Sequence, residues 1–344
     1  MRKFKLTVLA ICMLSIFNSC KEENHIAPEW GKDLTKPPQE NNTSIVAKGW
    51  TNTEKSFGDL PEYISVYKSP SSLVNKQVVS YIAVADMSKA KFDVLGDVGF
   101  DVTANGYGGK SVNTLTQFYG KNNHAVIINA GLFYYGNSFY YSQNLVVRNG
   151  VMLAPNQNYY SKDWVTMWYP TLGAFSVMDN NSYQTSWTYF NSAKVNYSYN
   201  QVANNDITKT PLQVPTATFP SAGVELKAKT AIGGVGVLLK NGVVQNTHVQ
   251  EMLDVSATSN QPRTAIGITA DKKMIFFVCE GRNVTPGVAG LTTADVANIM
   301  KELGCVEALN LDGGGSSGML INGKETIKPS GGSQRAVLTA VSLQ

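Results

Sequence analysis

Residues 308–319 read ALNLDGGGSSGM, an apolar run that ends at Asp312 and is followed by three glycines and two serines. Glycine loses more conformational freedom on folding than any other residue. Three in a row directly after a buried strand therefore indicate a backbone shape, or a close contact, that side chains would prevent. The stretch predicts a tight turn with a special role at the end of a strand.

The residues upstream of this turn predict a strand–helix–strand unit. Apolar strands are expected at 274–279 and 306–311, and between them LTTADVANIMKELGC has the apolar periodicity of a helix over 292–303. Thr292 is a capping residue at its start, and a glycine follows its end. A strand, a helix and a second strand at this spacing predict a parallel crossover.

In a parallel crossover both strands end at the same edge of the sheet. Glu280 and Arg282 follow the first strand, and Asp312 follows the second. Because ligands bind beyond the carboxyl ends of such strands, these three side chains are expected to share one rim.

The rest of the chain is rich in short β-type stretches. RNG at 148–150 and KNG at 240–242 predict hairpin turns. We expect the fold class α+β, with mixed, largely antiparallel twisted sheets and a few flanking helices. Residues 156–220, rich in Asn, Tyr, Ser and Thr, predict an irregular insertion that is either surface structure or a lid over a site.

The N-terminus predicts export from the cytoplasm. Three basic residues precede an apolar run at 6–17 that is too short for a membrane span and is typical of a signal peptide. Ser19 before Cys20 resembles a bacterial lipoprotein cleavage site. Residues 1–19 would then be removed and Cys20 would carry lipid, with ordinary secretion as the alternative.

The charged residues after Cys20 resemble surface-export tags of Bacteroidetes lipoproteins. The prediction is a protein outside the cytoplasm, anchored in the outer membrane of a Gram-negative bacterium and extending to the cell surface. Residues 20–44 are polar with three prolines and predict a disordered tether, followed by one domain over 45–344.

The amino-acid composition limits which classes of molecule this protein is expected to bind. Charged residues make up 16% of the chain, the net charge is +4, and no basic cluster occurs, so nucleic acid is not an expected partner. A surface rich in amides, hydroxyls and 16 tyrosines suits contact with carbohydrate. Cys279 and Cys305 are left in the mature chain, either as a disulfide or as two buried thiols.

Four interpretations of the glycine run compete. A P-loop needs a lysine and a helix after the glycines, and neither is present, so we reject it. A nucleophile elbow is present in form at Gly314, Ser316 and Gly318, but every histidine lies upstream. Successive N–H groups of Gly313, Gly314 and Gly315 could instead form an anion-binding nest beside Asp312. The fourth interpretation is a tight turn without a ligand.

Taken together, these motifs resemble the phosphodiester glycosidase family. ALNLDGGGSSGMLINGK at 308–324 is similar to its signature, and PRTAIGIT (262–269), EGR (280–282) and SQRAV (333–337) match in the same order. AVIINAGLFY at 125–134 resembles an early strand of the family. The resemblance is dense over 231–342, while Glu280 stands where members often have Asp and Gly318 where they often have Thr or Ala.

The resemblance implies cleavage of a sugar-1-phosphodiester, with a phosphorylated carbohydrate as substrate. A phosphate leaving group has a second pKa of roughly 6, so it needs countercharge more than a proton. Asp312 is the candidate base or nucleophile, with Glu280 as its partner. The phosphate clamp is expected from Arg263 first, then Arg335 and Arg282; for each arginine a surface ion pair is the alternative.

Smaller polar groups complete the expected site. Ser316, Ser317 and Asn129 would hydrogen-bond to sugar or phosphate, although Asn129 could equally cap a strand end. No zinc-type spacing occurs, and neither a metal nor a cofactor is expected. Two functions remain: a hydrolase of phosphate-linked glycans, and a surface lipoprotein that binds glycans without turning them over.

Overall fold

The computed structural model describes residues 42–245 and 247–344. The predicted signal peptide, Cys20 and most of the tether lie outside the described residues. The first described helix, α1 (Asn42–Ala47), begins three residues before the expected start of the domain. No helix among the described residues combines the length and the apolar character needed to cross a membrane.

An eight-stranded sheet forms the frame of the domain, and every pairing in it is antiparallel. Its strands, in spatial order, are β1 (Thr51–Asn52), β2 (Ile64–Lys68), β5 (Ser80–Asp86), β22 (Lys273–Cys279), β21 (Arg263–Thr269), β23 (Cys305–Asn310), β19 (Val237–Lys240) and β20 (Val243–Val244).

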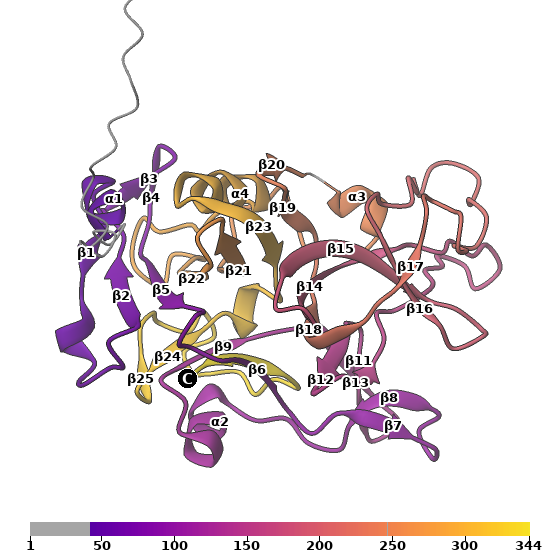
Figure 1. Ribbon diagram of the computed structural model, residues 1–344, viewed down its shortest axis with the longest axis horizontal. Coiled ribbons are helices and arrows are strands. Elements are labelled where there is room, and N and C mark those ends of the chain that lie inside the picture. Colours follow the sequence, from indigo (N-terminus) through magenta and orange to yellow (C-terminus); the bar gives the residue numbers. More distant parts are fainter. Residues whose placement is uncertain (1–41, 246) are drawn as a thin grey trace, which may run out of the picture. The chain divides into compact units, whose positions relative to one another are not determined.

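Two further sheets pack against this frame (Figure 1). The seven-stranded sheet runs β13 (Val151–Ala154), β12 (Val146–Arg148), β18 (Ala228–Gly233), β14 (Leu172–Met178), β15 (Tyr183–Phe190), β16 (Asn196–Tyr199), β17 (Val224–Glu225). The five-stranded sheet runs β25 (Lys324–Glu325), β24 (Met319–Ile321), β9 (Val126–Asn129), β26 (Ala340–Leu343), β6 (Phe92–Leu95).

Smaller elements complete the domain. A four-stranded sheet runs β10 (Phe133–Gly136), β11 (Phe139–Ser142), β8 (Gly106–Gly109), β7 (Gly99–Asp101), and β3 (Ser72–Leu73) pairs with β4 (Lys76–Gln77). The remaining helices are α2 (Leu115–Asn122), α3 (His248–Glu251), α4 (Thr293–Glu302) and the 3-10 turns η1 (Glu54–Ser56) and η2 (Gly314–Ser316). This is the expected α+β class, dominated by antiparallel sheets.

The hydrophobic core is divided into separate layers, because successive side chains of a strand point to opposite faces of its sheet. Side chains from the inner faces of all three large sheets form one cluster, including Phe92, Phe175 and Phe276, whose rings meet edge to face. The outer face of the eight-stranded sheet is covered by α4, and the outer face of the five-stranded sheet by α2 (Figure 1).

The predicted crossover is correct in direction, but its two strands are not neighbours. β22 and β23 both run antiparallel to β21, which lies between them, so they are parallel to each other. The reason is the short turn after Thr269, because a strand joined to the next by a tight turn pairs with it first. Both strands still end at one edge, and Arg263 begins β21 at that same edge.

Local signals in the sequence placed the helix and the two hairpins well. Thr292 caps α4 in a full capping box with Asp295, as predicted. The RNG and KNG turns join β12 to β13 and β19 to β20, and in both the Asn and the Gly have positive φ. Such φ values are what two-residue hairpin turns need.

Two other expectations are corrected or decided here. The segment 156–220 is not simply an irregular insertion, because it contributes β14, β15 and β16 to the middle of the seven-stranded sheet. Cys279 and Cys305 are free and buried thiols. Burial raises the pKa of Cys279 to about 12 and also raises that of Cys305, so neither is a reactive thiolate.

Close packing of α4 on β21 predicts a test of this fold. A Cβ on Gly267 would lie 2.7 Å from Met300 Cε and 2.9 Å from the backbone oxygen of Glu307. Gly267→Ala should therefore lower the free energy of unfolding by about 1–3 kcal/mol. Gly120→Ala, in α2 with nothing within 4 Å, should raise it by about 0.5–1 kcal/mol. Urea denaturation of both variants is the measurement, and equal stability of the two would contradict the packing.

Candidate active site

The candidate site lies at the edge of the eight-stranded sheet, where β21 begins and β23 ends. A cavity of about 180 Å³ opens there. Its lining residues come from this edge and from the loops beside it: Leu132, Asp254, Val255, Ser256, Gln261, Arg263, Arg282, Asn310, Leu311, Asp312, Gly313 and Gly314. The structure thus brings together Asp312, two of the three predicted arginines and two of the three glycines.

Asp312 is the titratable centre of this cavity. Enclosure by protein raises the pKa of Asp312 to about 6, because burial disfavours the charged carboxylate. Hydrogen bonds from Ser316 and from the Gly313 N–H, together with the charge of Arg335, lower the pKa and offset part of this effect. A carboxyl with a pKa close to neutrality can exchange protons during a reaction, as catalytic acids and bases do.

The three glycines allow two guanidinium groups to lie against the backbone. A Cβ on Gly314 would lie 2.8 Å from Arg282 Nη2, and one on Gly315 would lie 2.4 Å from Arg335 Nη2. Gly314 also has φ +59°, which most side chains disfavour. The requirement for glycine is therefore close approach of positive side chains to the turn.

The predicted anion nest is wrong for two of its three amides. The N–H of Gly314 donates to the carbonyl of Pro262 at 2.9 Å, and the N–H of Gly313 donates to the Asp312 carboxyl. The turn continues as η2, in which Ser316 N–H donates to Gly313 at 3.1 Å. The Gly313 and Gly314 amides are therefore already paired with the Asp312 carboxyl and the Pro262 carbonyl, so positive charge at the site comes from arginine.

Arg282 and Arg335 carry that charge at exposed positions. Arg282 Nε donates to Gln261 Oε1 at 2.9 Å, and Arg335 Nη1 donates to Ser316 Oγ at 3.5 Å. Among the described residues, every ion pair joins a lysine to an aspartate, and none involves an arginine. The surface ion pair considered for these arginines is therefore not what the structure shows.

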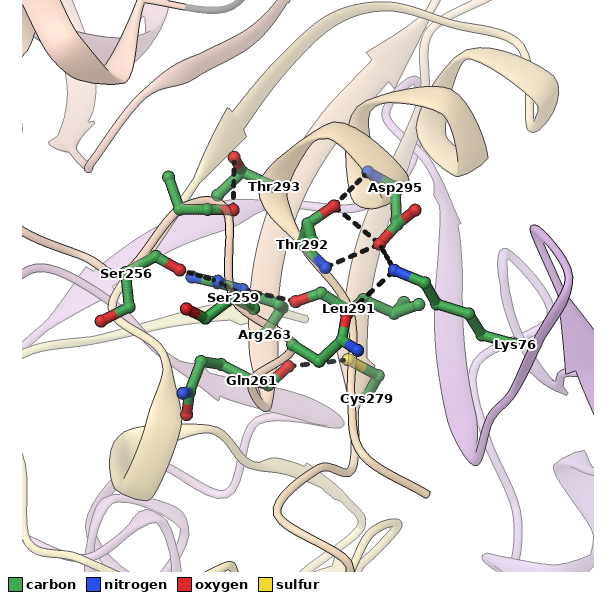
Figure 2. Close-up of polar contacts among 12 residues, drawn as sticks. Lys76, Ser256, Ser259, Gln261, Arg263, Cys279, Leu291, Thr292, Thr293 and Asp295 are labelled. Carbon is green, nitrogen blue, oxygen red and sulfur yellow. Dashed lines mark hydrogen bonds and ion pairs between the residues drawn. The ribbon is translucent and has the colours of Figure 1, made fainter. Parts of the chain in front are cut away.

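Arg263 has a different environment from the one expected for a phosphate clamp. It is 1% exposed, and its guanidinium donates to four backbone carbonyls, those of Val255, Ser256, Ser259 and Leu291, at 2.7–2.9 Å. Figure 2 shows this side chain between the 256–261 loop and Leu291, which lies just before the Thr292 cap of α4. Its hydrogen bonds hold the cavity wall, and the residue is part of the cavity lining, with its positive charge enclosed by these carbonyls.

The N-terminus of α4 is tied to the same network. Asp295 accepts hydrogen bonds from the Thr292 N–H and hydroxyl, both at 2.7 Å, and pairs with Lys76 (Figure 2). Residues Gln261 and Leu291 exchange backbone hydrogen bonds at 3.0 and 3.1 Å. The loop that forms one wall of the cavity is therefore fixed to the helix and to β21.

Asn129 is a structural clamp and does not face a ligand. It is fully buried, and its Nδ2 donates to the Asp312 carbonyl at 2.6 Å. Its Oδ1 accepts from the Thr264 hydroxyl at 2.7 Å and from the Gly318 N–H at 3.2 Å. The prediction that it binds substrate is wrong, because the turn itself uses every one of these polar groups.

Glu280 does not line the cavity that holds Asp312. Since Cys279 points toward α4, alternation turns Glu280 to the opposite face, where its Oε1 accepts from Lys328 N–H at 3.0 Å. The carboxyl also helps to raise the pKa of Tyr81, so it lies near that ring. The structure thus places the two predicted acids on different faces of one edge.

The serines are also separated. Ser316 donates to Asp312 and accepts from Arg335, whereas Ser317 is buried and its Oγ has no partner among the described residues. Ser316 is not part of the lining of the Asp312 cavity, and that lining contains no histidine, so the nucleophile elbow that was one interpretation of the sequence has no histidine partner there.

Sequence analysis did not name several polar residues of the cavity lining, of which Asp254 and Asn310 have the clearest chemical consequences. Asp254 is an exposed second carboxylate in its lining. Asn310 is 1% exposed, and its Nδ2 donates to the carbonyls of Val235 and Leu311, which leaves Oδ1 without a partner among the described residues. Asn310 sits inside the ALNLD stretch, but the sequence gives no sign of its unpaired oxygen.

No group of three or more His, Cys, Asp or Glu side chains suited to a metal occurs among the described residues. Carboxylate, guanidinium and amide groups are what the cavity offers. Such a set can bind an anion, orient hydroxyl groups and move a proton at Asp312.

Comparisons with known proteins agree with this arrangement. Residues 122–343 match the family model for phosphodiester glycosidase. The SPbeta prophage-derived uncharacterized protein YomE of Bacillus subtilis (strain 168) is 34% identical over 82 residues, which are 24% of this chain. The matched region spans only 12% of that relative's length.

Solved structures share the fold at low identity. The catalytic domain of zebrafish N-acetylglucosamine-1-phosphodiester alpha-N-acetylglucosaminidase, auto-inhibited by its pro-peptide, has a TM-score of 0.54 and 17% identity, covering 83% of this chain and 85% of that one. A hypothetical protein from Synechocystis gives 0.53 and 15%, with 83% and 64% covered.

A putative exported protein from Burkholderia pseudomallei K96243 has a TM-score of 0.52 and 15% identity, covering 79% of this chain and 75% of that one. The family model extends over the strands, the helix α4 and the glycine turn that build the cavity. This chain belongs to the phosphodiester glycosidase family.

Proposed function

We propose that this protein is a hydrolase that cleaves a sugar-1-phosphodiester between the anomeric carbon and the phosphate oxygen. The observation that carries the proposal is Asp312, with its pKa raised to about 6, in a cavity flanked by Arg282 and Arg263 and close to Arg335. An acid that titrates near neutrality beside positive charge suits a reaction with a phosphate leaving group.

Each charge has a part in the proposed reaction. Arg282 is exposed and lies against Gly314, so its fork can take two phosphate oxygens, and Arg335 lies against Gly315, close enough to Asp312 to lower its pKa. Arg263 adds a buried positive charge that no ion pair among the described residues neutralises. Together they stabilise the charge that develops on the departing phosphate.

Asp312 acts on the sugar side of the scissile bond. Above pH 6 it is mainly ionised and can attack the anomeric carbon or take a proton from water. The second carboxyl that glycoside cleavage usually uses is Asp254, since it lines the cavity and Glu280 does not. The phosphate leaves as a monoester, which needs little protonation near neutral pH.

The cavity volume and its polar wall suit one sugar unit. About 180 Å³ is enough for roughly six waters at about 30 Å³ each. The unpaired Oδ1 of Asn310 can accept a hydrogen bond from a sugar hydroxyl. Because a related fold carries the name of an N-acetylglucosamine-1-phosphodiester glycosidase, N-acetylglucosamine is the first sugar to test.

We further propose that the enzyme works outside the cytoplasm, held at the outer membrane by lipid on Cys20. The proposal rests on the basic and apolar segments of residues 1–19 and on the position of Cys20. Metabolic labelling with a clickable palmitate should mark the native chain and not Cys20→Ala, whereas equal labelling of both would exclude this anchor.

The reaction is tested with the methyl diester of N-acetylglucosamine-1-phosphate and a small panel of other sugar-1-phosphate methyl diesters. The chain without residues 1–19 should release free sugar from one of them, observed by NMR. Asp312→Asn should lose about 10²–10⁴-fold in rate, because it keeps the shape and removes the titrating group. Binding without release by the native chain would instead favour a glycan-binding protein.

Because of Asp312, the free energy of unfolding should fall as pH rises from about 4 to 6. The pKa of Asp312 is about 6 in the folded protein against an ordinary value of 3.8, so the folded state retains the proton to higher pH than the unfolded state does. The contribution of this group to stability is full below pH 4 and falls as pH rises through 6. In Asp312→Asn this decline should be absent. Urea titrations at pH 4, 5, 6 and 7 compare the two, and parallel curves would refute the shifted pKa.

The arginines should separate into two classes. Arg263→Lys leaves several buried carbonyls without donors and should lower the free energy of unfolding by about 3 kcal/mol or more. Arg282→Lys should change stability by less than about 0.5 kcal/mol but lower kcat/KM by about 10²-fold, because a lysine lacks the two-pronged fork. A stable, inactive Arg263→Lys would reverse these assignments.

A further inference from the structure

The hairpin of β10 and β11 carries large aromatic side chains that are exposed to solvent. Tyr134 is 51% exposed and stacks on Tyr141, with ring centroids 4.9 Å apart and planes 13° apart. Exposed groups of large apolar side chains mark binding surfaces more often than isolated ones do. The question is what this hairpin contacts.

Strand alternation connects this hairpin to the cavity. Gln143 N–H donates to the Leu132 carbonyl at 3.0 Å, which extends the β10–β11 ladder by one pair beyond Phe133. Leu132 and Tyr134 are two residues apart and therefore lie on the same face. Since Leu132 lines the cavity of Asp312, Tyr134 lies about 7 Å farther along the face that begins at the cavity rim.

The ring behind Tyr134 is held in place. The Tyr141 hydroxyl donates to the Ala104 carbonyl at 3.1 Å. A Cβ on Gly106 would approach the Tyr141 ring to 2.6 Å, so the glycine lets β8 lie directly against it. Tyr141 is therefore a fixed support, and Tyr134 is pre-positioned on it.

A third ring lies beside them. Gln143 Nε2 donates to Gln157 Oε1 at 2.9 Å, and Gln157 Nε2 donates to the Tyr159 carbonyl at 2.8 Å. These bonds tie the segment of Tyr159 to the hairpin. The pKa of Tyr134 is raised first by burial and then by the nearness of Tyr159. Tyr159 is 43% exposed. We name Tyr134, Tyr141 and Tyr159 the tyrosine platform.

We propose that the tyrosine platform is a stacking subsite for an uncharged sugar ring next to the reacting sugar phosphate, so that the substrate is a phosphate-linked glycan with at least two sugar units. This inference rests on the proposed function. The arginines at the cavity hold the phosphate, whereas the platform offers aromatic faces and hydroxyl groups without a charged side chain. The C–H groups on one face of a pyranose pack on an aromatic ring, because their partly positive hydrogens meet the negative face of the π system.

The same hairpin supplies a matched control. Tyr135 is 62% exposed and pairs with Tyr140 at a ring distance of 4.7 Å, but it is on the opposite face from Leu132 and Tyr134. Tyr135→Ser removes the same chemical group, from a more exposed position of the same strand, without touching the platform.

The kinetic test compares two probes with the same reacting sugar. One is the methyl diester of N-acetylglucosamine-1-phosphate, and the other is its diester with the 6-hydroxyl of a second N-acetylglucosamine. Tyr134→Ser should raise the ratio of the two-sugar KM to the one-sugar KM by about three- to tenfold. Tyr134→Phe should keep the native ratio, and so should Tyr135→Ser. A ratio unchanged in Tyr134→Ser, or changed equally in Tyr135→Ser, overturns the proposal.

A binding experiment separates this inference from the proposed reaction. Asp312→Asn is titrated with both probes and followed by NMR of the tyrosine ring signals, with and without Tyr134→Ser. Tighter binding of the two-sugar probe that is lost with Tyr134→Ser supports the subsite even if the native chain cleaves neither probe, which would refute the reaction alone. Equal affinity for the two probes overturns the subsite, even if both are cleaved.

Discussion

The guanidinium of Arg263 is the interaction on which the site depends. A buried cation that donates to four backbone carbonyls fixes the 255–261 loop, Leu291 and the start of β21 in one arrangement. Loops rarely hold such carbonyls inside a protein without a donor, since an unpaired buried polar group is costly. Arg263 makes the loop compact enough to serve as a cavity wall, and it leaves a positive charge behind that wall.

A second set of bonds fixes the floor of the cavity. Asn129, at the end of β9, joins the Asp312 carbonyl, Thr264 on β21 and the Gly318 amide. The glycine turn is therefore clamped between the five-stranded and the eight-stranded sheets. This position accounts for the properties of Asp312, because burial by the surrounding protein raises its pKa, while hydrogen bonds from Ser316 and the Gly313 N–H and the charge of Arg335 limit the rise.

The surface beside the cavity has a different chemistry from the cavity itself. Charge is gathered at the strand ends, where guanidinium groups lie on bare glycine backbone. Farther along the β10 face the groups are aromatic and uncharged. The two zones are continuous through Leu132, and together they fit a ligand that is anionic at one point and sugar-like beyond it.

Local chemistry in the sequence determined much of this protein. Thr292 and Asp295 marked the start of α4, the two NG pairs marked their hairpins, and the DGGG run marked the turn with the acid. These signals act over three or four residues, so they do not depend on the rest of the fold. The shared edge of β22 and β23 also followed, because a helix between two strands constrains their direction.

Only the tertiary structure decided which of the polar candidates face the cavity. From sequence, Arg263 is the first candidate for the phosphate clamp and Arg282 a later one, yet Arg263 is enclosed by carbonyls and Arg282 is exposed at the cavity. Glu280 turns away from Asp312 because a shift of one residue along a strand reverses the face. Asp254 and Tyr134 belong to segments that are far from Asp312 in the sequence, and only long-range packing brings these segments to the cavity and to the surface beside it. Sequence patterns report neighbours along the chain, whereas the site is assembled from residues that folding brings together.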